Sequence, residues 1–266
     1  MSSRVLQNCS ALVTGASKGV GKGIAIELAR AGCEVAVNYH SDATGAAQTV
    51  AEIRDLGGNA FEVEADVGSS FEVNKMFEKI LERTARLNIL VNNAGVQTWA
   101  RLLDLRESDW DRDINTNLKG CFLCTQVAAR HMKQHGGGEI INIGSGCNKL
   151  PFPRLVAYTA SKGGMEMFTK VAAIELAPYS IRVNCVAPGA ILIERTELES
   201  GDYSKTWGKA TPLGRVGVPA DVGQAVVFLA SAQASYITGQ TIWVDGAAFT
   251  KPNWPYEDEA DTPSQF

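Results

Sequence analysis

The chain has 266 residues, of which 45% are hydrophobic, enough to bury a large core. Its formal charge of −4 at pH 7 and its lack of a basic stripe argue against nucleic acid as a partner, and no apolar run of about 18 residues offers a membrane span. The first residues lack the apolar core of a signal peptide, so we expect a cytoplasmic protein.

Strand-like apolar runs alternate with helix-like amphipathic segments along the whole chain. This alternation predicts an α/β fold, a doubly wound Rossmann-type domain with a parallel sheet and helices on both faces. No linker or internal repeat interrupts it, so we expect one domain over residues 1–250. Residues 251–266 carry three prolines and an acidic run, and we interpret them as an acidic tail. The tail could be disordered or could lie across a neighbouring subunit.

The first strand-like stretch, residues 11–13, runs into a glycine-rich loop, residues 14–21, and then into a helix-like run. Glycines here allow a tight turn and let a dinucleotide pyrophosphate approach the backbone N–H groups. A turn that binds nothing would show the same glycines. The expected cofactor contacts in this loop are Gly15, Ser17, Lys18, Gly19, Val20 and Gly21.

The end of the second strand-like run, residues 34–39, bears on the choice of cofactor. Enzymes selective for NAD usually carry an acid there, which binds the ribose hydroxyls and repels a 2′-phosphate. This chain has Asn38 instead, and Lys18 offers a positive charge nearby. We therefore predict NADP, with NAD possible through dual use. The expected cofactor contacts at this strand end are Asn38, Tyr39, His40 and Ser41.

Six cysteines and one closely spaced histidine pair raise the question of metal or disulfide chemistry. Cys121 and Cys124 have a Cys-x-x-Cys spacing, but they lie in an apolar helical stretch without a second pair, which favours core thiols. His131 and His135 lie among polar residues that indicate a solvated helix end. We predict no functional metal and no disulfide framework.

A serine, a tyrosine and a lysine follow the apolar run at residues 139–143. Tyr158 and Lys162 are four residues apart and share a helix face, so the ammonium can lie beside the phenol. A tyrosine pKa of about 10 makes a poor base, but a neighbouring ammonium and a positive nicotinamide ring lower it. The phenolate could then take a proton from an alcohol whose oxygen is held by Ser145. Alone, Tyr-x-x-x-Lys is also a common surface pair.

Together these motifs resemble the short-chain dehydrogenase/reductase family, in order and over about residues 11–246. The resemblance implies an oxidoreductase that moves a hydride between a nicotinamide and a secondary alcohol or carbonyl. It implies a catalytic group of Asn117, Ser145, Tyr158 and Lys162, in which Asn117 holds a relay water. It also implies further cofactor contacts at Asp66, Val67, Asn93, Ala94, Gly95, Tyr158, Lys162, Pro188, Gly189 and Ile191. Relatives often carry threonine where this chain has Ile193, which leaves one nicotinamide contact open.

The substrate depends on segments that vary within the family. The Pro151-Phe152-Pro153 loop and the surroundings of Lys162 are similar to the glucose 1-dehydrogenase branch, which implies a sugar or cyclic polyol as substrate. Cys147 and Asn148 depart from that branch. The 3-oxoacyl-carrier-protein reductases are the alternative, and basic residues near the pocket mouth would suit an acidic carrier. A non-catalytic cofactor-sensing protein is the third reading.

Residues 192–211 are polar and glycine-interrupted, as expected of a substrate lid that orders over a ligand, although a plain surface connection would look similar. Residues 236–246 resemble the family's last strand and its subunit-packing turn. The resemblance implies a homotetramer or homodimer with two-fold interfaces. A small-molecule substrate is the other partner that we expect.

Overall fold

The computed structural model describes residues 5–199 and 201–250, so the predicted tail at 251–266 lies outside the described residues. Within that part a single seven-stranded sheet has the order β3-β2-β1-β4-β5-β6-β7, and every neighbouring pair is parallel. The strands are β1 (Ser10–Val13), β2 (Glu34–Tyr39), β3 (Asn59–Glu64), β4 (Ile89–Asn92), β5 (Gly138–Ile143), β6 (Ile181–Pro188) and β7 (Thr241–Val244). The predicted doubly wound fold is confirmed.

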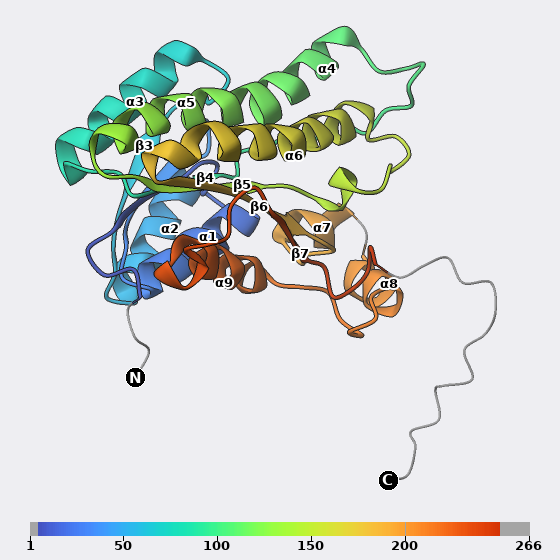
Figure 1. Cartoon of the computed structure of the whole chain (residues 1–266). Helices are drawn as coiled ribbons and strands as arrows, with labels where there is room; N and C mark the ends of the chain where they lie inside the picture. Colours follow the sequence, from blue (N-terminus) through green and yellow to red (C-terminus); the bar gives the residue numbers. More distant parts are fainter. Residues whose placement is uncertain (1–4, 200, 251–266) are drawn as a thin grey trace.

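Helices cover both faces of the sheet (Figure 1). One face carries α1 (Gly19–Arg30), α2 (Ala43–Asp55) and α9 (Pro219–Ala230), and the other carries α3 (Ser70–Thr84), α5 (Gly120–Gln134) and α6 (Val156–Leu176). Successive residues of a strand point to opposite faces. Accordingly Val13 belongs to the core under α1, whereas Leu12 belongs to the core under α3.

One long helical run changes its pitch in the middle. It begins as α4 (Glu107–Ile114), passes through the π-helical segment η1 (Asn115–Lys119) and continues as α5. A π-helical turn inside an α-helix frequently occurs at a functional site. Here the turn carries Asn117, which is fully buried, so the irregular stretch coincides with a predicted catalytic residue.

The predicted lid is largely helical. Residues 192–211 contain α7 (Glu194–Glu199) and α8 (Tyr203–Ala210). Short 3-10 turns complete the described elements: η2 (Gly146–Asn148), η3 (Ala177–Tyr179) and η4 (Ala232–Ala234).

Across residues 5–199 and 201–250, no helix is long and apolar enough to cross a membrane. The same residues contain no cluster of three or more His, Cys, Asp or Glu side chains that could hold a metal ion, and all six cysteines are free thiols.

Candidate active site

The carboxyl ends of neighbouring parallel strands meet at one edge of the sheet, where α/β proteins bind their ligands. The glycine loop follows β1, residues 93–95 follow β4, Ser145 follows β5, and Gly189 follows β6. These four strands are neighbours in the sheet. The fold therefore brings together most of the residues that the sequence predicted to bind cofactor or substrate.

The glycine loop and the end of β4 form one hydrogen-bonded unit. The Asn93 side chain donates to the carbonyls of Thr14 (2.9 Å) and Gly15 (3.0 Å). In return the Thr14 hydroxyl accepts from the N–H groups of Asn93 (2.9 Å) and Ala94 (3.0 Å). A Cβ at Gly21 would lie 2.4 Å from both Asn93 Nδ2 and the Gly15 carbonyl oxygen, so only glycine fits there.

The start of α1 fits a dinucleotide pyrophosphate. The residue that precedes the helix, Lys18, makes no capping hydrogen bond with its side chain. The first N–H groups of a helix have no partner within the helix, and with the helix dipole they attract an anion. Gly15 and Gly19, at φ of +62° and +58°, turn the loop with backbone conformations that glycine adopts freely. These features are consistent with the predicted cofactor site.

Asn38 lies near the end of β2, as expected, but its side chain is turned into the protein. Its side chain is 1% exposed, its oxygen accepts from the Gly15 N–H (3.1 Å), and its amide nitrogen faces the carbonyls of Val63 (3.3 Å) and Ala65 (3.2 Å). Asn38 thus supports the glycine loop from beneath and is not available as a ribose ligand. The expected side-chain contact with the cofactor is therefore not supported, because the amide is engaged with these backbone groups.

Lys18 extends toward the end of β2. Its ammonium lies 3.3 Å from Asp42, the acid that caps α2 by accepting from the Gly45 N–H (3.0 Å). This backbone hydrogen bond and, after it, the bond from Lys18 lower the pKa of Asp42. Lys18 therefore lies beside Asp42, the residue that follows the exposed His40 and Ser41, and its contact with a cofactor phosphate stays a prediction.

Ser145 is fixed by the turn that follows it. Its hydroxyl oxygen accepts from the Cys147 N–H (3.3 Å), and its own N–H donates to the Asn148 side chain (3.0 Å). The Ser145 hydroxyl is also close enough to the phenol of Tyr158 on α6 to oppose the rise in the tyrosine pKa that burial causes. The predicted serine and tyrosine are therefore neighbours, although they are thirteen residues apart in the sequence.

Lys162 lies on the same helix one turn later and is 3% exposed. Its ammonium donates to the Ile143 carbonyl at the end of β5 (2.6 Å) and lies 5.6 Å from the centre of the Tyr158 ring. Burial lowers the pKa of Lys162. The lysine and the tyrosine are neighbours, as predicted, but the lysine is held by the backbone.

Desolvation raises the pKa of Tyr158 to about 12 in the protein without cofactor. The groups that oppose this are the Ser145 hydroxyl and the charge of Arg195. The sequence analysis expected Lys162 to lower the tyrosine pKa. Because the ammonium points to the Ile143 carbonyl, that effect is not seen in the free protein, and a positive nicotinamide ring becomes the main candidate for it.

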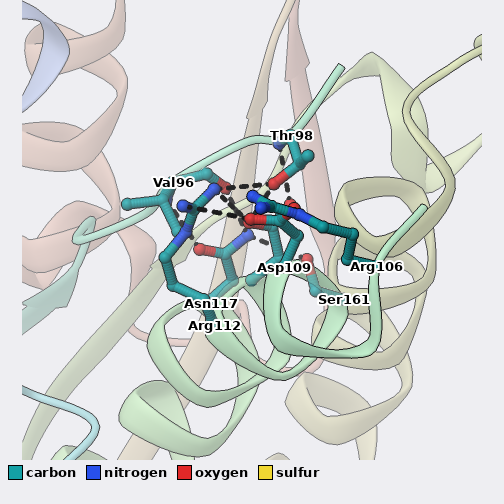
Figure 2. Close-up of polar contacts among 8 residues, drawn as sticks. Val96, Thr98, Arg106, Asp109, Arg112, Asn117 and Ser161 are labelled. Carbon is teal, nitrogen blue, oxygen red and sulfur yellow. Dashed lines mark hydrogen bonds and ion pairs between the residues drawn. The ribbon is translucent and has the colours of Figure 1, made fainter. Parts of the chain in front are cut away.

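Asn117 connects three parts of the site. Its oxygen accepts from the Val96 N–H (2.8 Å), and its nitrogen donates to the Val96 carbonyl (2.9 Å) and to the Ser161 hydroxyl (3.0 Å), as Figure 2 shows. Ser161 in turn donates to the Tyr158 carbonyl (2.7 Å). The asparagine thereby ties the chain after β4 to the helix that carries the tyrosine. Its role in a water relay stays a prediction.

The remaining predicted contacts flank this centre. Asp66, two residues beyond β3, accepts from the Gly68 N–H (2.8 Å), and Val67 is buried. Gly189 packs against Asp245, since a Cβ there would lie 2.7 Å from the Asp245 Cα. Ile191 is buried and does not offer its side chain to solvent.

Two features of the site were not predicted. A Cβ at Gly146 would lie 2.3 Å from the ring of Phe249, so this ring rests on the backbone next to Ser145. Phe249 also meets Phe152 edge-on, with ring centres 5.7 Å apart, and Phe152 lies 6.5 Å from Trp207 of α8. We call Phe152, Trp207 and Phe249 the aromatic cluster. The second feature is Asp113, described below.

Comparison with known proteins gives one answer for the family. A family model described as enoyl-(acyl carrier protein) reductase matches residues 15–247. A 3-oxoacyl-(acyl-carrier-protein) reductase of Staphylococcus aureus is 42% identical over 240 residues, which cover 90% of this chain and 98% of that protein. The chain belongs to the short-chain dehydrogenase/reductase family. It is therefore an NAD(P)-dependent oxidoreductase.

Solved structures of other family members superpose closely. A gluconate 5-dehydrogenase from Burkholderia cenocepacia, in complex with NADP and tartrate, has a TM-score of 0.87 and 35% identity, covering 94% of this chain and 98% of that one. The angucycline C-6 ketoreductase LanV with bound NADP has a TM-score of 0.86 and 36% identity, covering 92% and 97%. Family members with this fold thus act on quite different substrates.

Proposed function

We propose that this protein transfers a hydride between NADP and a secondary alcohol or carbonyl of a sugar or related polyol. The observation that carries the chemistry is the placement of Ser145 next to Tyr158 at the strand ends, beside the glycine loop. Its partners Lys162 and Asn117 complete the group. The substrate class rests on different residues and is argued separately.

In this mechanism the bound nicotinamide ring supplies the hydride acceptor during oxidation and the hydride donor during reduction. Tyr158 takes the proton from the substrate hydroxyl in oxidation and returns it in reduction. Ser145 would hold the substrate oxygen. Its hydroxyl oxygen already accepts from the Cys147 N–H, so its hydroxyl hydrogen can donate to the substrate. Lys162, held by the Ile143 carbonyl, keeps a positive charge near the phenol and the nicotinamide ribose.

The aromatic cluster supports a ring-shaped or polyhydroxylated substrate. Aromatic faces bind the C–H faces of such molecules, while a few polar groups fix their orientation. Arg195 is a candidate for such a polar group, because its charge is close enough to Tyr158 to lower the tyrosine pKa against the effect of burial. Two other polar residues near Ser145 are engaged elsewhere: Asn148 binds the Ser145 N–H, and Lys149 lies 5.6 Å from the Trp243 ring centre.

An acyl chain would instead need an apolar path. Ile193 is one apolar residue of the predicted lid, but its side chain packs over the glycine loop, 3.5 Å from where a Cβ of Gly19 would lie. The gluconate 5-dehydrogenase relative adds support for a polyol. The second candidate is reduction of a 3-oxoacyl thioester, which the 42% identity to the Staphylococcus aureus reductase favours.

The deciding experiment compares catalytic efficiency on aldoses and gluconate with that on a 3-oxoacyl thioester. We expect polyol oxidation with NADP to be the more efficient reaction. Strong thioester reduction without polyol oxidation would reject the sugar assignment and establish the second candidate. A protein that turns over neither class would require a different carbonyl substrate for the same catalytic group.

Preference for NADP is supported by Lys18 and by the NADP in two related structures. Lys18→Ala should weaken NADPH binding roughly tenfold, because a charge-assisted phosphate contact is lost, and should leave NADH binding unchanged. The preference should also shrink at high salt. The matched control is Lys22→Ala, a lysine of α1 paired with Glu52. Tighter binding of NADH than NADPH by the unaltered protein would refute the assignment.

Self-association is supported by an apolar face on α5 and α6. Phe122, Met167, Val171 and Ile174 of these helices are all exposed in the single chain. Large exposed apolar patches usually mark an interface, and identical subunits usually meet across a two-fold axis. We therefore propose a homotetramer or homodimer. Sedimentation should give a multiple of the 28.5-kDa chain mass, and a single-chain species at micromolar concentration would contradict the proposal.

A further inference from the structure

Asp113 is a fully buried carboxylate, with 0% of the residue exposed, and the mechanism above gives it no role. It lies on α4, four residues before Asn117. One of its oxygens accepts from the Thr98 N–H and the other from the Thr98 hydroxyl, both at 2.9 Å. Burying a charged group is costly unless it is paired and hydrogen-bonded, so a role for this acid is expected.

The Thr98 contact holds the middle of a short connection, residues 96–100, which we call the 96–100 segment. Asn117 binds both backbone groups of Val96 at its start. At its end the Ala100 N–H donates to the Arg154 carbonyl (2.9 Å), and Ala100 forms a β-bridge with Leu155. Leu155 immediately precedes α6. The segment is thus fixed at three points, and its last contact is one turn from Tyr158.

Charged side chains surround the middle contact (Figure 2). Arg112 donates to the Thr98 hydroxyl (2.7 Å) and lies 3.6 Å from Asp113. Arg112 also lies 3.4 Å from Asp109, which binds Arg106 at 2.7 Å. Two acids and two arginines therefore alternate around Thr98. The arrangement gives the buried Asp113 carboxylate both of its required hydrogen bonds and a counter-charge.

We propose that Asp113 is a positioning residue: by holding Thr98 it fixes the 96–100 segment against the start of α6, and so fixes Tyr158 relative to the substrate. The proposal rests on the proposed function for its catalytic part only. The fixing of the segment is a property of the protein alone, and it can be measured without substrate.

The same carboxylate also acts on Tyr158 through its charge. Besides burial and the Ser145 hydroxyl, the ionisable groups that act on the phenol are Cys147, Arg195 and Asp113, and the Lys162 ammonium lies 5.6 Å from its ring centre. Among them Asp113 raises the pKa of Tyr158, because a nearby negative charge disfavours the phenolate. Removal of this charge should lower the tyrosine pKa. The apparent pKa of Tyr158 in the pH–rate profile should then move to lower pH, for alcohol oxidation and for carbonyl reduction alike.

The test compares Asp113→Asn with Asp111→Asn. The control removes an exposed acid from the same helix. In Asp113→Asn we expect faster hydrogen exchange at the 96–100 segment, a pH–rate profile displaced to lower pH, and a turnover loss of roughly 10- to 100-fold, as a displaced catalytic group costs. The affinity for NADPH should stay unchanged. The control should match the unaltered protein in all four measurements.

Thr98→Val provides a second variant that keeps the Asp113 charge and loses only the two contacts of the hydroxyl, to Asp113 and from Arg112. It should speed exchange at the 96–100 segment without moving the pH profile, and it serves if Asp113→Asn does not fold. Unchanged exchange in both variants would overturn the proposal, as would a turnover loss in Asp113→Asn without faster exchange. If the unaltered protein oxidises or reduces none of the tested substrates, the proposed function fails, while the exchange measurement still decides the positioning role.

Discussion

Replacement of Tyr158 by phenylalanine should lower turnover by roughly 10²- to 10⁴-fold, the usual effect of losing one acid–base group. Phenylalanine keeps the ring and removes only the hydroxyl that lies near Ser145. NADPH binding should remain nearly unchanged, because the glycine loop and the start of α1 are untouched. Steady-state turnover and fluorescence titration of the cofactor measure the two effects separately.

The control for this variant is Tyr236→Phe, which removes a hydroxyl from a fully exposed tyrosine and should have no effect. The pH dependence gives a further check. The pKa of Tyr158 is about 12 without cofactor, and oxidised nicotinamide should lower it. Alcohol oxidation should thus rise with pH to a plateau set by a pKa below 12. A phenylalanine variant with near-normal turnover would exclude Tyr158 as the acid–base group.

Replacement of Gly21 by alanine should strongly weaken cofactor binding. The added Cβ would lie 2.4 Å from the Gly15 carbonyl oxygen and from Asn93 Nδ2, so the loop backbone must move. Overpacking of this kind typically costs about 1–3 kcal/mol of stability. A similar loss of binding free energy, about 3 kcal/mol, would weaken NADPH affinity roughly a hundredfold. Cofactor titration and thermal unfolding measure both.

Gly163→Ala is the matched control, since a Cβ at this position of α6 meets nothing within 4 Å. Alanine is the better helix former by about 1 kcal/mol, so this variant should be at least as stable as the unaltered protein. If Gly21→Ala bound NADPH normally, the loop would not be the pyrophosphate site, and the cofactor would have to bind elsewhere.

The sequence predicted the parts of the site that follow strands directly. Gly15, Asn93 and Ser145 each come just after an apolar run, and parallel strands deliver such residues to one edge of the sheet. Lys162 and Tyr158 were paired correctly, because helical spacing determines which side chains share a face. These predictions required only local periodicity.

Other features depend on contacts between distant segments, which periodicity does not contain. Asn38 closes a strand as expected, but the direction of its side chain depends on the carbonyls of β3 behind it. The role of Asp113 depends on a chain reversal that brings Thr98 onto α4, and one π-helical turn separates Asp113 from the start of α5. Neither leaves a sequence pattern.

Phe249 illustrates a third kind of omission. It lies beyond the last strand, where the chain shows no strand or helix periodicity, so nothing near it in the sequence indicates its contact with Gly146. The one indication in the sequence is Gly146 itself, because a glycine next to the predicted catalytic serine lets another side chain approach the backbone closely. The substrate side of the site is therefore the part that sequence alone described least well.

The central claim is hydride transfer with Tyr158 as the proton carrier. Deuterium transfer from a labelled secondary alcohol to NADP, followed by mass spectrometry of the cofactor, tests it most directly. The account predicts one deuterium on the nicotinamide ring with the unaltered protein, and its near-complete loss in Tyr158→Phe at saturating cofactor. Absence of transfer from every alcohol of the panel, or equal transfer by the phenylalanine variant, would contradict the account.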